Sequence, residues 1–153
     1  MRRRIQRKGR AFTLIEVLLV AGILALLAAF VVPRLWEQAK EAKIKIAEAA
    51  VGRNGSFAKA LEAYKWDMGK YPDTDESLAA LVVPRSARRD EKYKGPYLEQ
   101  TAEELKDPWG NAFEYRSPGQ FNEEGYDLWS RGPDGQDDGG KSGSDDIKNW
   151  VEK

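Results

Sequence analysis

Five aspartates and five glycines share the 15 residues GPDGQDDGGKSGSDD at 132–146. Carboxylates on glycine-rich backbone supply the flexible oxygen ligands that Ca²⁺ prefers, whereas Zn²⁺ favours nitrogen and sulfur. We do not interpret the stretch as an EF-hand, because we expect Asp134 to lack the partners of that motif at the third and fifth places, and the terminal glutamate is absent. Its composition also fits a solvated linker that holds no ion. From these residues alone, a calcium loop and an empty loop are both open.

The two ends of this acidic stretch are expected to be tethered. A predicted strand, residues 126–130, precedes it, and Ile147 and Trp150 follow it as an apolar pair that favours burial. Closing a glycine-rich loop costs entropy, and this loop also crowds like charges. A hard cation would offset both costs.

Glu16 is a second unusual residue, because its charge lies within an apolar stretch. It is the only charged side chain in the 21 residues from Phe12 to Val32. A carboxylate inside a segment built for lipid costs roughly 2–3 kcal/mol unless it finds a partner. Near a helix end it can reach the membrane surface instead. The residue alone does not decide between a paired and a surface-seeking carboxylate.

Enzymatic chemistry finds little support in the composition. The 153 residues include no Cys and no His, which excludes thiolate sites, Ser-His-Asp triads and histidine zinc sites. A hydrolase would have to use carboxylates such as Glu114 and Asp127. These lie on predicted strands, where exposed charge is the ordinary explanation. We therefore expect that the protein is not an enzyme.

Charge is distributed unevenly along the chain. Residues 1–10 hold six Lys or Arg and no acid, and the rest carries 19 basic and 25 acidic residues, a net charge of about −6. This balance disfavours nucleic-acid binding. The apolar run that follows would span about 31 Å as a helix, enough to cross a membrane, and the basic cluster favours a cytoplasmic N-terminus. An ordinary signal peptide is the alternative, but the run is longer than usual and contains Glu16.

A long amphipathic helix is predicted over residues 34–68, ending at Gly69 and Pro72. Its apolar face comprises Phe57, Leu61, Tyr64 and Met68. The stretch GRNG, residues 52–55, is its weak point, because interior glycines cost on the order of 1 kcal/mol each. Composition alone favours a break there.

The C-terminal half is predicted to form a small α+β domain. Its expected elements are a short helix at 74–83, a loop at 85–106, a tight turn at 107–111, and an antiparallel hairpin at 112–130. The hairpin strands AFEYR and YDLWS both alternate and are rich in aromatic residues. We expect the hairpin to pack on the long helix.

The stretch RKGRAFTLIEVLLV resembles the N-terminal signal of type IV pilins and of the pseudopilins of type II secretion. The resemblance implies that a prepilin peptidase removes residues 1–11 as a leader, cutting between Ala11 and Phe12, and that Phe12 is then N-methylated. The family usually has Gly before the cut, so cutting after Gly9 is the alternative. With the first cut, Glu16 becomes the fifth residue of the mature chain.

This resemblance gives Glu16 and Pro33 a role in assembly. Cleavage would create an ammonium on Phe12 one helical turn before Glu16. In a filament that carboxylate can neutralise the amine of a neighbour, and low dielectric favours the stagger that pairs them. The family also implies a helix that continues past Pro33 and unwinds just before it on assembly, although proline equally suits a helix start. It further implies one stem helix running through residues 52–55, which we predict as continuous with a possible bend.

The stretches LKDPWGNAFEYRSPGQ, YDLWSRGPDGQ and DDIKNW resemble the major pseudopilins of type II secretion, the protein G family. The similarity runs from Arg10 to Trp150 and is weakest over 85–104. It implies an α+β, type IV pilin-like fold, with a long N-terminal helix packed on a small antiparallel sheet and an acidic C-terminal loop. The implied parts are a leader (1–11), a transmembrane and filament-core helix (12–33), and a periplasmic domain (34–153).

The resemblance implies that the loop at 131–146 binds Ca²⁺, because major pseudopilins bind calcium there. Carried over by position, Asp134 and Asp145 are the expected side-chain ligands, and Asp146 is a further contributor. The backbone oxygens of Arg131 and Gln136 complete the expected set. This loop is longer than in some relatives, so other side chains can substitute, namely Asp137, Asp138, Ser142 and Ser144.

The implied function is that of the major structural subunit of the type II secretion pseudopilus, a helical homopolymer that drives export of folded proteins across the outer membrane. The implied location is the bacterial inner membrane, with the C-terminal domain in the periplasm. The implied partners are inner-membrane lipid, the prepilin peptidase, minor pseudopilins, an assembly platform with its ATPase, and an outer-membrane secretin. A type IV pilin of surface fibres is the alternative, disfavoured by the missing cysteines and the acidic loop. A membrane-anchored periplasmic enzyme is the third hypothesis.

Overall fold

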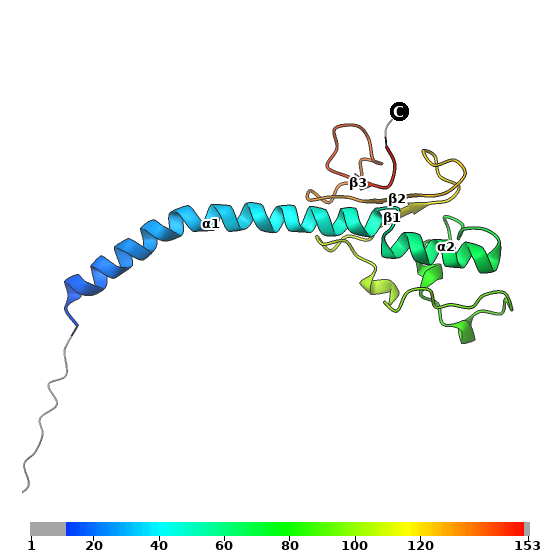
Figure 1. The fold of residues 1–153 in the computed structure, drawn as a ribbon, viewed down its shortest axis with the longest axis horizontal. Coiled ribbons are helices and arrows are strands. Elements are labelled where there is room, and N and C mark those ends of the chain that lie inside the picture. The colour runs from blue at the N-terminus through cyan, green and yellow to red at the C-terminus, as the bar shows by residue number, and fades with distance from the viewer. Residues whose placement is uncertain (1–11, 152–153) are drawn as a thin grey trace, which may run out of the picture. The chain divides into compact units, whose positions relative to one another are not determined.

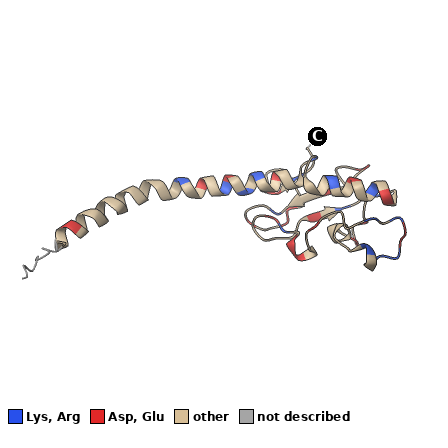
Figure 2. Cartoon of the chain, turned by 60° about the horizontal axis from the view of Figure 1, so that its bottom comes forward, with Lys and Arg blue, Asp and Glu red and all other residues tan. Residues whose placement is uncertain are grey.

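The computed structural model describes residues 12–151 and contains two compact units, Met1–Lys40 and Glu41–Lys153. The first helix, α1, covers Leu14–Val51 and continues through Pro33. Within the described residues, one helical run contains an 18-residue window apolar enough to cross a membrane, with a mean hydropathy of 2.8 and none of the window buried. Figure 2 shows one acidic position near the start of α1, followed by a long stretch without charge.

The helical run Leu14–Met68 follows the predicted stem helix, and it is interrupted at the glycines, where a bend was expected. Residues 52–55 form a turn that separates α1 from α2, which covers Ser56–Met68 (Figure 1). The N–H of Gly55 donates to the carbonyl of Gly52 at 2.8 Å, and a Cβ at Gly55 would overlap the carbonyl oxygens of Ala49 and Ala50. The chain therefore turns where the glycines permit close backbone approach, as composition alone indicated.

The end of α2 and its apolar face are as predicted. Gly69 adopts φ 80° and its N–H donates to the carbonyl of Lys65 at 2.8 Å, which is a left-handed glycine cap. Phe57, Leu61 and Tyr64 are buried in the core of the second unit. That core joins one face of α2 to the sheet and to the segments that precede the sheet.

The helix expected at 74–83 is shorter and of a different kind. Residues 74–77 form turns, and only η1, Leu78–Leu81, is helical, as a 3₁₀-helix. The segment expected as a loop contains two further 3₁₀ turns, η2 (Arg85–Ala87) and η3 (Ala102–Glu104). Leu78 and Leu81 are buried, so the apolar stretch still contributes to the core.

The predicted hairpin is confirmed, and a third strand extends it. Strands β1 (Glu114–Arg116) and β2 (Asp127–Ser130) pair antiparallel, with Tyr115 opposite Leu128. Strand β3 (Ile147–Lys148) pairs with the other edge of β2, with Ile147 opposite Ser130. The sheet order is β1-β2-β3, and the acidic loop connects the last two strands (Figure 1).

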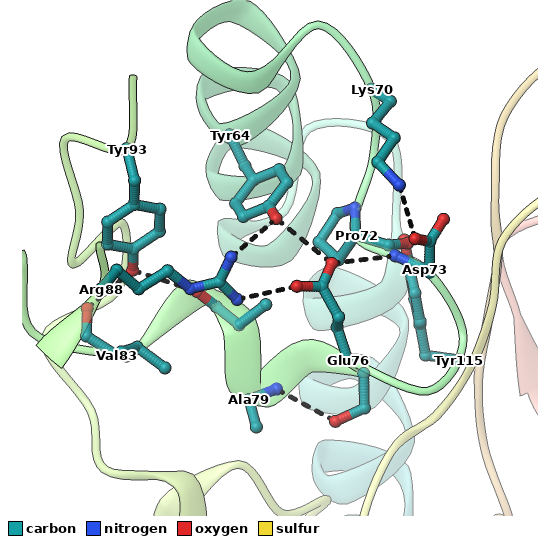
Figure 3. Close-up of polar contacts among 12 residues, drawn as sticks. Tyr64, Lys70, Pro72, Asp73, Glu76, Ala79, Val83, Arg88, Tyr93 and Tyr115 are labelled. Atoms are coloured by element: carbon teal, nitrogen blue, oxygen red, sulfur yellow. Dashed lines mark hydrogen bonds and ion pairs between the residues drawn. The ribbon is translucent and has the colours of Figure 1, made fainter. Parts of the chain in front are cut away.

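Arg88 anchors residues 85–104, the segment where the family resemblance is weakest (Figure 3). Its guanidinium donates to Glu76 at 3.1 Å and to the hydroxyl of Tyr64 at 3.2 Å, and it lies 4.9 Å from the ring centre of Tyr93. The hydroxyl of Tyr93 in turn donates to the carbonyl of Val83 at 2.6 Å. Burial raises the pKa of Tyr64. Charge-assisted hydrogen bonds and ring contacts thus connect this irregular segment to α2.

Candidate metal site and assembly residues

Residues 131–146, which we call the acidic loop, are folded back on themselves between β2 and β3. Gly132 has φ 65° and lies against the backbone of Asp145, where a side chain would overlap the carbonyl of that residue. Gly140 has φ 66° and lies under the ring of Trp150. Positive φ and close approach both require glycine, so the two ends of the loop meet at positions that only glycine fills without strain.

The acidic loop brings three carboxylates together. Asp134, Asp138 and Asp145 each offer an oxygen, and these three oxygens all lie within 4.8 Å of one another. Local hydrogen bonds orient the group, because the N–H of Asp134 donates to Asp145 at 3.0 Å and the N–H of Gln136 donates to Asp134 at 2.8 Å. Like charges this close repel unless a cation or protons compensate.

Asp146 occupies a different environment from these three. Its side chain is 8% exposed and accepts a hydrogen bond from the N–H of Gly140 at 2.7 Å. Its other oxygen, Oδ1, has no hydrogen-bond partner among the described residues. Burial raises the pKa of this carboxyl, and the nearby carboxylates of Asp137 and Asp138 raise it further. The trio does not include Asp146, whose role as a ligand is still a prediction.

Asp138 is the member of the trio that the expected ligand set held only as a substitute. The signal for it was present in the spacing. Counting from Asp134, Asp138 stands fifth, Gly139 sixth and Asp145 twelfth, which are the first, fifth, sixth and twelfth places of a calcium loop with Asp in place of the terminal Glu. The expectation that the fifth place lacks a partner is therefore wrong, because Asp138 stands there and joins the trio.

The trio fits a hard cation by its donor chemistry. Three carboxylates on a glycine-rich backbone provide oxygen ligands, and Gln136 and Arg131 add backbone carbonyls nearby in the chain. The side chain of Arg131 does not compete for this site, because its Nε donates to Glu114 on β1 at 2.9 Å. The cluster is therefore able to hold a divalent ion.

The two carboxylates considered for a hydrolase are both engaged in structure. Glu114 pairs with Arg131. Asp127 is fully buried, which contradicts the expectation of an exposed charge. It accepts hydrogen bonds from three consecutive backbone N–H groups, at 2.6 Å from Gln120, 3.0 Å from Phe121 and 2.9 Å from Asn122. The loop that joins β1 and β2 is thus built around this side chain.

Of the residues expected to act in processing and assembly, Phe12 and Glu16 lie around the start of α1, and Pro33 lies inside it. Ala11 lies outside the described residues. Phe12 is 79% exposed and lines, together with Glu16 and Val20, an apolar groove along the helix. The N–H of Glu16 donates to the hydroxyl of Thr13 at 3.3 Å, which caps the first turn. Phe12 and the carboxylate of Glu16 thus lie on the same face.

Comparison with known families finds a match for the N-terminal helix and another for the rest of the chain. The family model for type II secretion system (T2SS) protein G matches residues 34–150. This chain belongs to the protein G family of type II secretion. A second model, the prokaryotic N-terminal methylation motif, matches residues 6–32. The fold and family expected from the sequence are therefore confirmed.

Individual relatives agree with this assignment over nearly the whole chain. Type II secretion system core protein G of Pseudomonas aeruginosa is 37% identical over 95% of this chain and 97% of its own length. The protein of the same name from Vibrio cholerae is 39% identical over 94% of this chain and 93% of its own length. The crystal structure of the major pseudopilin of enterohaemorrhagic Escherichia coli superposes with a TM-score of 0.56 at 27% identity, covering 76% of this chain and 89% of that one.

Proposed function

We propose that this chain is the major structural subunit of a type II secretion pseudopilus, a filament that drives folded proteins across the outer membrane. One observation carries the proposal: the protein G domain follows an apolar, unburied stretch of helix whose only charge between residues 12 and 32, Glu16, shares a groove with Phe12. An exposed apolar helix needs lipid or other helices around it. The membrane would supply the lipid before assembly, and the filament would supply the neighbouring helices after it.

Maturation connects the groove to assembly. Cleavage between Ala11 and Phe12 would leave an ammonium at the start of α1, and methylation would retain its charge. In a neighbouring subunit the Glu16 carboxylate would accept this ammonium, which removes the cost of two isolated charges in a low-dielectric filament core. Pro33 lacks a backbone N–H, so α1 carries one missing hydrogen bond there, at the end of the apolar stretch. We assign that position to helix adjustment on assembly.

The same proposal sets location and partners. The basic residues before Phe12 favour an N-terminus in the cytoplasm, and the second unit would then lie in the periplasm. Partners would then be other copies of this chain, minor pseudopilins, the prepilin peptidase, the assembly platform with its ATPase, and the secretin. The carboxylates weighed for hydrolysis are engaged in structural contacts, which supports an assembly role without catalysis.

Mass spectrometry and N-terminal sequencing of the protein recovered from membranes test the proposal. We expect a chain that begins at N-methylated Phe12 and retains the whole apolar stretch. Co-expression with an inactive prepilin peptidase is the control and should return the chain with residues 1–11 attached. A product that begins after Val32 would show that the apolar stretch is an ordinary cleaved signal and would contradict the proposal.

We further propose that the acidic loop holds Ca²⁺, with Asp134, Asp138 and Asp145 as carboxylate ligands. The backbone oxygens of Arg131 and Gln136 and the carboxylate of Asp146 are the other donors that we assign to it. Three clustered carboxylates with one lysine in the loop support a divalent ion over none. Bound Ca²⁺ would join the two ends of the loop and so hold β3 on β2.

Calcium is expected to raise the melting temperature of the full chain in detergent by several degrees relative to chelator. A ligand at 100 times its Kd stabilises the folded state by about 2.7 kcal/mol, provided that it does not bind the unfolded chain. Asp134→Ala should remove the difference between calcium and chelator, whereas the exposed Asp75 lies outside the loop and Asp75→Ala should preserve it. Equal melting of the parent in calcium and in chelator would refute the site.

A further inference from the structure

Trp66 is an exposed aromatic side chain on α2. It is 89% exposed, and no ring or cation contact involves it within the described residues. It stands on the outer face of the helix with Lys59, Glu62 and Ala63, which are also exposed. A fully exposed tryptophan is costly in water and is the residue type most often found to dominate a protein interface.

A cleft lies at the opposite end of α2, within the same compact unit. Its volume is about 340 Å³, and its apolar lining comes from α1, from the start of α2 and from the segment around β1. The lining side chains used here are Ile46, Ala50, Phe57, Leu105, Pro108 and Phe113. Ile46 is 60% exposed at the edge of the cleft, and Phe57 meets Phe113 edge to face at 4.9 Å. Polar residues, among them Gln100, Glu104, Lys106 and Asp107, complete the lining. The cleft is therefore mostly apolar, preformed and open to a side chain from outside.

The chain cannot fill this cleft with its own Trp66. Nine residues of helix separate Phe57 from Trp66, which is an axial rise of about 13 Å. The projection and the cleft are thus two different patches of one surface. A contact between such patches on two copies is heterologous, and repetition of a heterologous contact builds an open helical filament.

We propose that Trp66 of one subunit inserts into the cleft between Ile46 and Pro108 of a neighbouring copy in the pseudopilus. The proposal rests on the filament function proposed above. Each patch carries one acid and one base, since Lys59 and Glu62 share the exposed face of Trp66, and Glu104 and Lys106 line the cleft. None of these four residues forms an ion pair within the described residues. An indole against the apolar side chains of the cleft, with each acid facing a base of the other subunit, fits a second copy of this chain.

Cysteine cross-linking in assembled filaments tests this contact directly, because the natural chain contains no cysteine. Ala63→Cys places a thiol one turn from Trp66, and Gln100→Cys places a thiol at the edge of the cleft, both at exposed positions. With both substitutions in one full-length chain, a short bismaleimide should produce a ladder of dimers, trimers and longer species. Each single-cysteine chain should produce no ladder.

Trp66→Ser in the double-cysteine chain should reduce the ladder by at least about tenfold, as expected for the loss of a central tryptophan. Ile46→Ser should weaken it from the cleft side, and Trp66→Phe should retain part of it. Val151→Ser is the matched control, because Val151 is 85% exposed and lies outside the cleft lining. Urea unfolding of Trp66→Ser should match the parent, since the side chain makes no core contact.

Sedimentation of the same samples separates the possible failures. Parent chains that sediment as filaments but form no ladder, or a Trp66→Ser ladder as strong as the parent ladder, would overturn the contact and leave the filament function intact. A dimer formed by Ala63→Cys alone would show a symmetric contact and would also overturn it. Parent chains that never sediment as filaments would overturn the proposed function and this contact together.

Discussion

Subunits that carry Glu16→Ala are expected to reach the membrane and to be cut and methylated, yet to yield at least about tenfold fewer filaments than the parent. Removing a carboxylate from an apolar helix makes insertion of the single subunit more favourable, by roughly 2–3 kcal/mol. Stability of the monomer and yield of the polymer should therefore move in opposite directions. That divergence distinguishes a residue used for pairing from one that lies at the membrane surface by chance.

Two substitutions and one control make the Glu16 result interpretable. Glu16→Gln retains the shape without the charge and should fail like alanine, whereas Glu16→Asp should retain part of the assembly. Leu19→Ala is the control, since Leu19 is an exposed apolar residue one turn further along α1. Filaments are counted by sedimentation and electron microscopy, and membrane insertion is measured by carbonate extraction. Full assembly of Glu16→Ala with the parent stagger would exclude charge pairing as the register device.

The long apolar helix and the hairpin were predictable because each has a strong periodic or compositional signal. The run from Phe12 to Val32 has one charge, and the two hairpin strands alternate around aromatic residues. Strand β3 has no comparable signal, because two residues are too few to show a period. Its existence depends on pairing with β2, which brings together segments far apart in the sequence.

At residues 52–55, composition and family resemblance pointed to different structures. Two glycines indicated a break, and the family pattern led us to predict a helix that continues with a possible bend. The structure has a turn because the backbone at Gly55 lies against the carbonyl oxygens of the last turn of α1, a place that no side chain can occupy. The close backbone contact at Gly55 determines the turn, and the two glycines that permit it were visible in the sequence.

The composition of the acidic loop was enough to predict a cation site, but it did not identify which carboxylates lie together. Asp134 and Asp145 are in the trio, as the family pattern implied, and Asp138 joins them through a spacing that we did not recognise. The burial of Asp146 could not be read from its neighbours, because it results from contact with Gly140, six residues earlier. Burial depends on how the loop folds, which neither composition nor spacing encodes.

The burial of Asp127 was missed for a related reason. Alternation along YDLWS predicts one buried and one exposed face, but all four residues of β2 are buried. On the second face, the backbone N–H groups of the loop that joins β1 to β2 surround the Asp127 carboxylate, and Trp150 and Asp137 contact Trp129. A strand covered on both faces does not show alternate burial, whatever its sequence period.

Asp127→Ala is expected to lower the free energy of unfolding by about 2–4 kcal/mol, a large share of the stability of a small domain. The substitution leaves the N–H groups of Gln120, Phe121 and Asn122 without their acceptor, and a donor left unpaired away from water costs about 1–3 kcal/mol. Gln120 and Phe121 are exposed residues, so water that reaches their N–H groups keeps the total below three full penalties. Asp127→Asn should recover part of the loss, because the amide oxygen of asparagine accepts hydrogen bonds. The recovery should be incomplete, because the NH₂ group of the amide would face backbone N–H donors.

Urea unfolding of the full chain in detergent, followed by the fluorescence of the buried Trp129 and Trp150, measures this effect. The midpoint should fall while the dependence on urea concentration is unchanged, as expected when only the stability changes. Glu124→Ala is the matched control, since Glu124 is an exposed acid of the same loop and should shift the free energy by no more than about 0.5 kcal/mol. If Asp127→Ala unfolds at the midpoint of that control, the carboxylate does not hold the loop.

The acidic loop depends on the same strand, because β3 pairs only with β2 among the described strands. A destabilised Asp127→Ala chain should therefore also show a weaker response to calcium.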